Sequence, residues 1–149
     1  MELNLKGKHI FSLIKLINKM NIKKEIKEFF KRATKNDRKK NNLTIKLKLA
    51  LGDMENNPVN VNKVFRENED LAQCFEEVQE EKKDLMLDIA FFVMEKAGEG
   101  EKEIFKLLAD MYSMSVQEFE DLGFNEVLEA VMKVIKNEEM QKGFLSIFK

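Results

Sequence analysis

The sequence predicts a mainly α-helical protein, built as a compact bundle of short helices. One Pro and six Gly in 149 residues permit long helical stretches and disfavour a turn-rich β fold. Apolar residues make up 44% of the chain and recur mostly three and four positions apart, which is the spacing of one helix face. Capping signals, such as Ser115 followed three residues later by Glu118, divide these stretches into short segments. At this length we expect a single domain, residues 1–149.

The N-terminal third predicts two helices and a loop. Residues 8–20 form the first helix, because four aliphatic residues share one face. These are Ile10, Leu13, Ile14 and Ile17. Asn21 is expected to cap a second helix over residues 22–33. Residues 34–42, "TKNDRKKNN", contain no apolar residue and predict a solvated loop.

The next segment, "LTIKLKLAL" (residues 43–51), has two interpretations. Its apolar residues alternate with Lys and Ala, which favours a strand. With the weakly alternating "MELNLKG" as a partner, it would form a small two-stranded β element. A helix start is the alternative. The stretch near residues 52–62 is expected to be a loop, because Gly, Asn and Pro gather there.

The remainder of the chain predicts further helices. Residues 69–97 are expected to be helical, with the charged "QEEKKD" (residues 79–84) either a helix face or a break, and Gly98 is expected to end this stretch in the left-handed C-cap position. Another helix is expected over residues 101–112. A short helix follows Ser115, a further helix is capped by Asn125, and a last helix covers the apolar end of the chain.

Charge is distributed unevenly along the chain. Residues 1–50 hold 15 Lys/Arg against four Asp/Glu, a net charge of +11, whereas residues 51–149 hold 11 against 23, a net charge of −12. Two explanations follow. The two halves attract each other within the fold or between copies, or the basic half offers its surface to an acidic partner.

The stretch "ADMYSMSVQEFEDLGFNEVLEAVMKVI" has the short helices and tight turns of a DNA-reading helix-turn-helix. From Ala109 to Val131 it carries six acidic residues, and no Lys or Arg occurs before Lys133. Phosphates would repel such a segment, so nucleic-acid binding is not expected here. In the basic half, Phe29 and Phe30 could stack on bases, but their helical spacing favours core packing. A small nucleic-acid-associated regulator that uses the basic half is kept as an alternative function.

Residue types that support catalysis are scarce. The chain has one His, His9, and one Cys, Cys74, which are too few for a zinc site. The helical Glu-x-x-His pair of di-iron bundles is absent, because Lys6 precedes His9 by three residues. No phosphate-binding loop of the ATPase type occurs. We therefore expect no enzyme activity, no cofactor and no metal.

We also predict where His9 and Cys74 lie in the fold and where the protein is located in the cell. His9 is expected either at a helix end or partly exposed, and Cys74 in the core. A lone thiol is typical of a reducing cytosol. Lys8, Lys15 and Lys19 interrupt the first apolar stretch, and no apolar run reaches the roughly 20 residues that cross a bilayer. We expect a soluble intracellular protein with no membrane association.

Both ends of the chain resemble the tail assembly chaperones of phages and prophages of Gram-positive bacteria. The resembling segments are "MELNLKGKHIFSLIKLINKM" and "EIFKLLADMYSMSVQEFEDLGFNEVLEAVMKVIKNEEMQKGFLSIFK", so the likeness covers roughly residues 1–33 and 83–149. Its motifs are the "LLAD" segment at Leu107–Asp110, the capped helix at Ser115–Glu118, the acidic helix at 125–137, and a tail with Phe144 and Phe148. The middle, about residues 34–82, departs from the family pattern.

This resemblance implies a function. Such chaperones bind the long helical tape-measure protein in the cytoplasm of the infected bacterium without using ATP. They keep it soluble until tail-tube subunits polymerise around it, and they are absent from the mature virion. In many phages the gene also yields a longer form by translational frameshifting. A structural tail component that stays in the particle is a further alternative.

Apolar and Met-rich helix faces are expected to form the binding surface, because Met adapts its shape to a partner. A C-terminal apolar cluster either folds back on its own domain, or docks on a second copy or a client. We expect the chain to form a homo-oligomer. The candidate partner-binding residues are Met111, Met114, Phe144, Leu145, Ile147 and Phe148.

Overall fold

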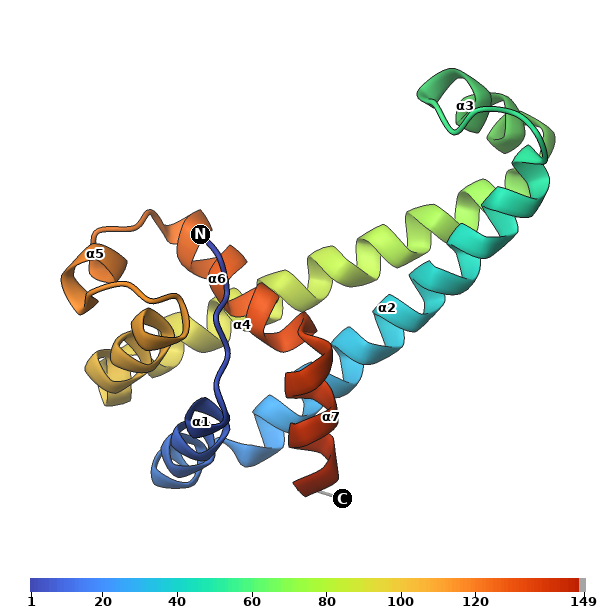
Figure 1. The fold of residues 1–149 in the computed structure, drawn as a ribbon. Helices are drawn as coiled ribbons and strands as arrows, with labels where there is room; N and C mark the ends of the chain where they lie inside the picture. The colour runs from blue at the N-terminus through green and yellow to red at the C-terminus, as the bar shows by residue number, and fades with distance from the viewer. Residues whose placement is uncertain (148–149) are drawn as a thin grey trace. The chain divides into compact units, whose positions relative to one another are not determined.

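The computed structural model describes residues 1–147, apart from the side chains of Ala97, Glu99 and Ile147. Over this range the chain forms α-helices and no β-strand (Figure 1). The helices are α1 (Gly7–Met20), α2 (Lys23–Leu51), α3 (Pro58–Glu67), α4 (Glu69–Met111), α5 (Val116–Glu120), α6 (Phe124–Lys136) and α7 (Glu138–Ile147). The mainly α fold class is confirmed. The small two-stranded β element is wrong, because residues 43–51 are the last turns of α2.

The alternation in residues 43–51 arises from two faces of one helix. Leu43 and Leu51 are buried and Leu47 is half-buried, at spacings of four residues. Ile45 and Leu49 lie on another face and are exposed. Two rows of apolar residues offset by two positions produce an alternating pattern, although each row has helical spacing.

The predicted loop at residues 34–42 is also helical, within α2. Two contacts with α4 support this polar stretch. The side-chain amide of Asn36, which is buried, donates to the carbonyl oxygen of Val78 at 2.9 Å, and Lys39 forms an ion pair with Glu81 at 2.7 Å. The Lys39 ammonium lowers the pKa of Glu81.

The predicted loop near residues 52–62 is correct only at its beginning. Helix α3 starts at Pro58, which suits the first helical position because its missing N–H would have no intrahelical partner. Asn57 caps this helix, since its side-chain oxygen accepts from the backbone N–H of Asn60 at 2.9 Å.

Three predicted helix boundaries differ from the observed ones. Gly98 is inside α4, and the break in that helix falls at Gly100, whose backbone angles are not helical. Asn21 ends α1 in a left-handed conformation, with φ of 55°. Helix α6 begins at Phe124, ahead of the expected cap at Asn125, because the Glu126 carboxylate accepts the backbone N–H of Gly123 at 2.8 Å.

The chain folds into two compact units whose boundaries fall inside α2 and α4. The terminal unit comprises Met1–Ala33 and Leu85–Lys149, and the middle unit comprises Thr34–Asp84. Each unit therefore contains residues from both the basic half of the sequence (1–50) and the acidic half (51–149).

The core of the terminal unit combines helices from both ends of the chain. Phe30 of α2 stacks on Phe144 of α7 with ring centroids 4.5 Å apart, and Phe29 meets Phe92 edge to face at 5.3 Å. Tyr112 is buried and donates its hydroxyl to the carbonyl oxygen of Ala130 at 2.6 Å. An apolar cavity of about 110 Å³ remains among the core side chains, bordered by residues such as Ile17, Ile89 and Val134.

The middle unit has a smaller core. The second part of α2 lies alongside the first part of α4, and α3 belongs to the connection between them (Figure 1). Val64 and Val78 are buried, and Phe65 lies 5.4 Å from Phe75 between ring centroids. Cys74 is exposed, so its expected place in the core is wrong.

The uneven charge of the sequence is balanced inside each unit. The terminal unit holds 16 Lys/Arg and 16 Asp/Glu, and the middle unit holds 10 and 11. Ion pairs join the basic part of the sequence to the acidic part in both: Lys8 with Asp110, Lys19 with Glu103, Arg32 with Asp88, and Lys39 with Glu81. Attraction within the fold is therefore the explanation that these contacts favour.

Among residues 1–147, no helix is both long enough and apolar enough to cross a lipid bilayer.

Candidate partner-binding groove

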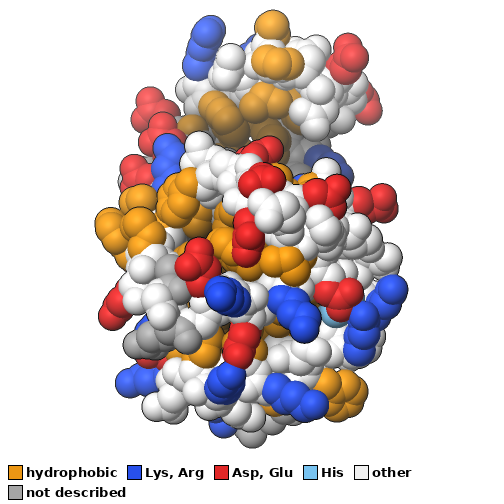
Figure 2. Space-filling model, turned by 90° about the vertical axis from the view of Figure 1, so that its left-hand side faces the viewer, with side chains coloured by type: hydrophobic (Ala, Val, Ile, Leu, Met, Phe, Trp, Pro, Cys, Tyr) orange, Lys and Arg blue, Asp and Glu red, His pale blue; other side chains and the backbone are white. Residues whose placement is uncertain are grey.

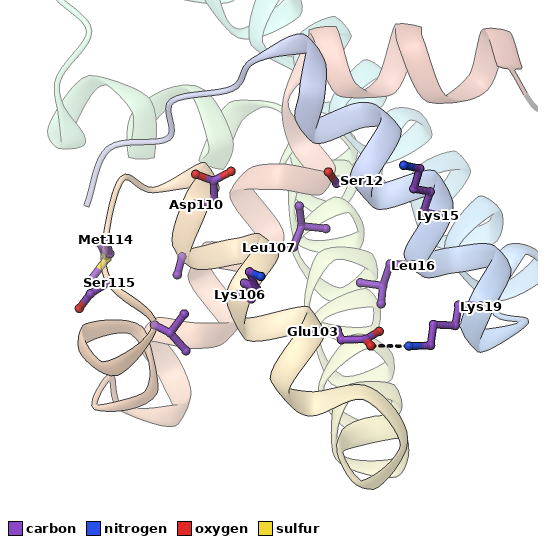
Figure 3. A pocket seen from close by; sticks show the side chains of 12 residues that line it. Ser12, Lys15, Leu16, Lys19, Glu103, Lys106, Leu107, Asp110, Met114 and Ser115 are labelled. Atoms are coloured by element: carbon purple, nitrogen blue, oxygen red, sulfur yellow. Dashed lines mark hydrogen bonds and ion pairs between the residues drawn. The ribbon is translucent and has the colours of Figure 1, made fainter.

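A hollow of about 790 Å³ lies in the terminal unit, between α1 and the last turns of α4 (Figure 3). We call it the groove. Helix α1 lines one side, α4 lines the other, and the turn before α5 closes one end (Figure 3). Its lining residues are Ser12, Lys15, Leu16, Lys19, Glu103, Lys106, Leu107, Ala109, Asp110, Met114, Ser115 and Val116.

The floor of the groove is apolar and partly open to solvent. Leu16, Leu107 and Met114 are half-buried, and Val116 is 37% exposed. Leu16 and Leu107 are half-buried, and each directly precedes in sequence a buried core residue, Ile17 or Leu108. A partly covered apolar floor of this kind suits the side chains of an amphipathic helix.

His9 fixes the start of α1 beside the groove. It lies in the first turn of α1, so its expected place at a helix end is confirmed, but it is only 1% exposed, so the alternative of partial exposure is wrong. The backbone N–H of Lys6 donates to His9 Nδ1 at 2.9 Å, so this nitrogen accepts in the neutral ring. The other nitrogen, Nε2, then carries the hydrogen and donates to the Asp110 carboxylate at 3.0 Å. Both ring nitrogens are satisfied, and α1 is tied to α4.

Asp110 also binds Lys8, at 2.8 Å. The hydrogen bond from the Lys8 ammonium is the main cause that lowers the pKa of Asp110, and the bond from His9 adds to it, whereas desolvation acts in the opposite direction. Asp110 thus stays ionised and is already engaged by two residues of its own chain.

A second ion pair crosses the groove. Lys19 of α1 bonds to Glu103 of α4, and Figure 3 marks this contact as a dashed line. Both acidic side chains of the groove, Glu103 and Asp110, are therefore paired with cations of the terminal unit.

The turn before α5 holds Met114 at the end of the groove. Ser113 adopts a positive φ of 54°, and the backbone N–H of Met114 donates to the carbonyl oxygen of Ala109 at 2.9 Å. The predicted capping box is confirmed: Ser115 accepts the N–H of Glu118 at 3.2 Å, and Glu118 accepts the N–H of Ser115 at 2.8 Å. That second bond lowers the pKa of Glu118.

The six predicted partner-binding residues lie in different surroundings. Met111 and Phe144 are each 1% exposed and belong to the core. Leu145 is half-buried against that core. Met114 lines the groove. The side chain of Ile147 and the whole of Phe148 lie outside the described residues.

Among the other groove residues, no sequence pattern distinguishes Leu16, Val116 and Lys106. Leu107 stands out only in the "LLAD" segment, and Lys15 only as an interruption of an apolar stretch. Their grouping depends on how α1 packs against α4, which sequence spacing alone does not give.

A separate apolar stripe occurs on α4, also in the terminal unit. Leu87, Phe91 and Met94 share one helix face and are 55%, 63% and 52% exposed. On the face shown in Figure 2, hydrophobic side chains reach the surface between charged ones, and Lys and Arg lie among Asp and Glu. On this face, apolar surface is thus present without a large region of one charge.

Within the described residues, no group of three His, Cys, Asp or Glu side chains is placed to hold a metal ion. The His9–Asp110 pair is structural, because the imidazole is buried and both nitrogens are engaged.

A scan of protein-family models, a search of curated proteins and a search of solved structures each gave no match to this chain.

Proposed function

We propose that this chain is a phage tail assembly chaperone, which binds a helical segment of the tape-measure protein without ATP and keeps that protein soluble. The observation that carries the proposal is the groove, whose floor of half-buried Leu16, Leu107 and Met114 offers apolar contact to a helix. The chaperone acts in the cytoplasm of the host bacterium and leaves before the virion is complete. It contacts its client as a homo-oligomer.

The division of the chain into two units adds support to the proposal. The segments that resemble such chaperones, roughly residues 1–33 and 83–149, are almost the same as those of the terminal unit. The departing segment, about residues 34–82, nearly matches the middle unit. The groove lies wholly within the part of the chain that carries the resemblance.

Co-expression with a phage tape-measure protein tests the proposal. We expect the client to move into the soluble fraction and to elute with this chain in size-exclusion chromatography. Light scattering on the same column measures the oligomeric state. If client solubility is unchanged and no complex elutes, the proposal fails.

A groove variant makes the test specific. Replacing Met114 and Val116 together by Ser removes apolar contact at one end of the groove, and both side chains are partly exposed, so folding should persist. We expect client binding about tenfold weaker. Val59→Ser is the matched control, because Val59 lies on α3 of the middle unit and is 76% exposed. Equal loss in both variants would argue against the groove.

Complete phage particles test the alternative that the chain is a structural tail component. Mass spectrometry of purified virions should detect the tape-measure protein and not this chain. Its presence in stoichiometric amounts would favour the structural role.

A further inference from the structure

The charged side chains of the groove are not all satisfied within the chain. Glu103 is bound by Lys19, and Asp110 is bound by Lys8 and His9. The side chains of Lys15 and Lys106 make no hydrogen bond or ion pair with the described residues, and both are exposed. The charges left for a partner are therefore positive.

The two lysines belong to opposite sides of the groove. Lys15 comes from α1 and Lys106 from α4, and in Figure 3 Leu16 and Leu107 lie between these two lysines, whereas Met114 lies beyond Lys106. An occupant that covers Leu16 and Leu107 therefore has a cation along each of its two edges.

We infer that the groove selects an amphipathic helix whose apolar stripe is flanked on both sides by Asp or Glu. This inference rests on the proposed function and specifies the class of client segment. An apolar stripe covers Leu16 and Leu107, and carboxylates beside the stripe meet Lys15 and Lys106. A helix with basic flanks would place like charges together, which disfavours its binding.

Other ligand classes match the groove less well. A highly charged polyanion would meet the lysines but would leave the apolar floor without apolar contact. A helix with uncharged flanks would partly desolvate Lys15 and Lys106 without pairing them. Both features of the groove are satisfied together only by an apolar stripe with acidic edges.

Two synthetic peptides serve as probes of this inference. They share length and a Leu stripe at helical spacing, and they differ only in having Glu or Lys beside the stripe. Fluorescence anisotropy of the labelled peptides against the whole protein should show the Glu peptide binding about tenfold more tightly at low salt. Raising the salt concentration should shrink the difference, because exposed charge pairs are screened. Equal affinities, a preference for the Lys peptide, or no binding of either peptide would overturn the inference.

Charge reversal locates the preference. The double variant Lys15→Glu with Lys106→Glu should reverse the order of the two peptides. The control is Lys24→Glu with Lys31→Glu, which changes the net charge equally at exposed positions outside the groove. The control should keep the preference for the Glu peptide. A reversal in both variants would show that the net charge of the protein, rather than the groove, sets the preference.

The inference and the proposed function can fail separately. A protein that solubilises the tape-measure protein but does not distinguish the peptides retains its function and loses the inferred selectivity. A protein that prefers the Glu peptide but forms no complex with the tape-measure protein keeps the groove chemistry and loses the assigned client.

Discussion

Tyr112 gives a direct measure of burial, because it is the only tyrosine and the chain has no tryptophan. Burial raises its pKa from 10.0 to about 12. A pKa raised by folding means that the neutral phenol stabilises the fold fully below pH 10 and that this stabilisation is lost as the pH rises toward 12.

Ultraviolet absorbance of tyrosinate checks this prediction. In the folded protein we expect ionisation near pH 12, coupled to loss of helical circular dichroism, whereas in concentrated urea it should occur near pH 10. Ionisation near pH 10 with the helical signal intact would show that Tyr112 is accessible to solvent.

The Asp110 carboxylate should matter more than its exposed position suggests. Asp110→Ala leaves the buried Nε2–H of His9 without its acceptor, and we expect a loss of about 1–3 kcal/mol in the free energy of unfolding. Asp110→Asn keeps an acceptor oxygen and should lose less. Urea unfolding followed by circular dichroism measures both variants, with Glu129→Ala as an exposed acidic control on α6.

The pH dependence of this contribution has a definite sign. The folded-state pKa of Asp110 is lowered, so its stabilisation is present above the ordinary value of 3.8 and is lost as the pH falls through the lower folded value. Stability in Asp110→Ala should therefore fall less in acid than stability in the unmodified protein. Parallel acid curves for the two proteins would contradict this role.

At the scale of elements, helix α4 has two aliphatic residues, two positions apart, that differ strongly in burial. Ile89 is 1% exposed, and Ile89→Ala should cost about 2–5 kcal/mol because it leaves a cavity in the core. Leu87 is 55% exposed, and Leu87→Ala should change the free energy of unfolding by no more than about 0.5 kcal/mol. Urea unfolding measures both. Similar losses at the two positions would mean that a contact covers Leu87 in solution.

Sequence periodicity was sufficient to predict the helices that bury one face. Helix α1 and the capping box at Ser115 were predicted correctly, because local spacing and local hydrogen bonds determine them. For residues 34–42 the predicted loop is wrong, and for residues 43–51 the alternating pattern favours a strand over the helix that was the alternative. Their helix depends on partners far along the chain, including the Val78 carbonyl oxygen for Asn36 and the carboxylate of Glu81 for Lys39.

The candidate site was harder to predict than the helices. Met114 was identified from its residue type, and it lines the groove. Phe144 could equally have faced a partner, and its burial depends on stacking against Phe30, more than 100 residues away in the sequence. Lys15 and Lys106 gain significance only because other groups occupy Glu103 and Asp110.

At the scale of the whole molecule, charge balance argues against strong nucleic-acid binding. The terminal unit has equal numbers of basic and acidic residues, and the middle unit has one more acidic than basic residue. Phosphate binding depends on an excess of positive charge. We therefore expect little retention of the protein on immobilised DNA at low salt.

A peptide of residues 34–50 is the positive control for that measurement. It holds six Lys/Arg and one Asp, so it should bind DNA and elute as the salt concentration rises. Retention of the whole protein as strong as that of the peptide would revive the nucleic-acid alternative.

The void of about 110 Å³ in the core of the terminal unit affects how the protein responds to compression. Unfolding eliminates internal empty space, so hydrostatic pressure favours the unfolded chain in proportion to such voids. The terminal unit should consequently melt under pressure more readily than a bundle of its size without a void. A noble gas such as xenon, by occupying the space, should oppose that effect.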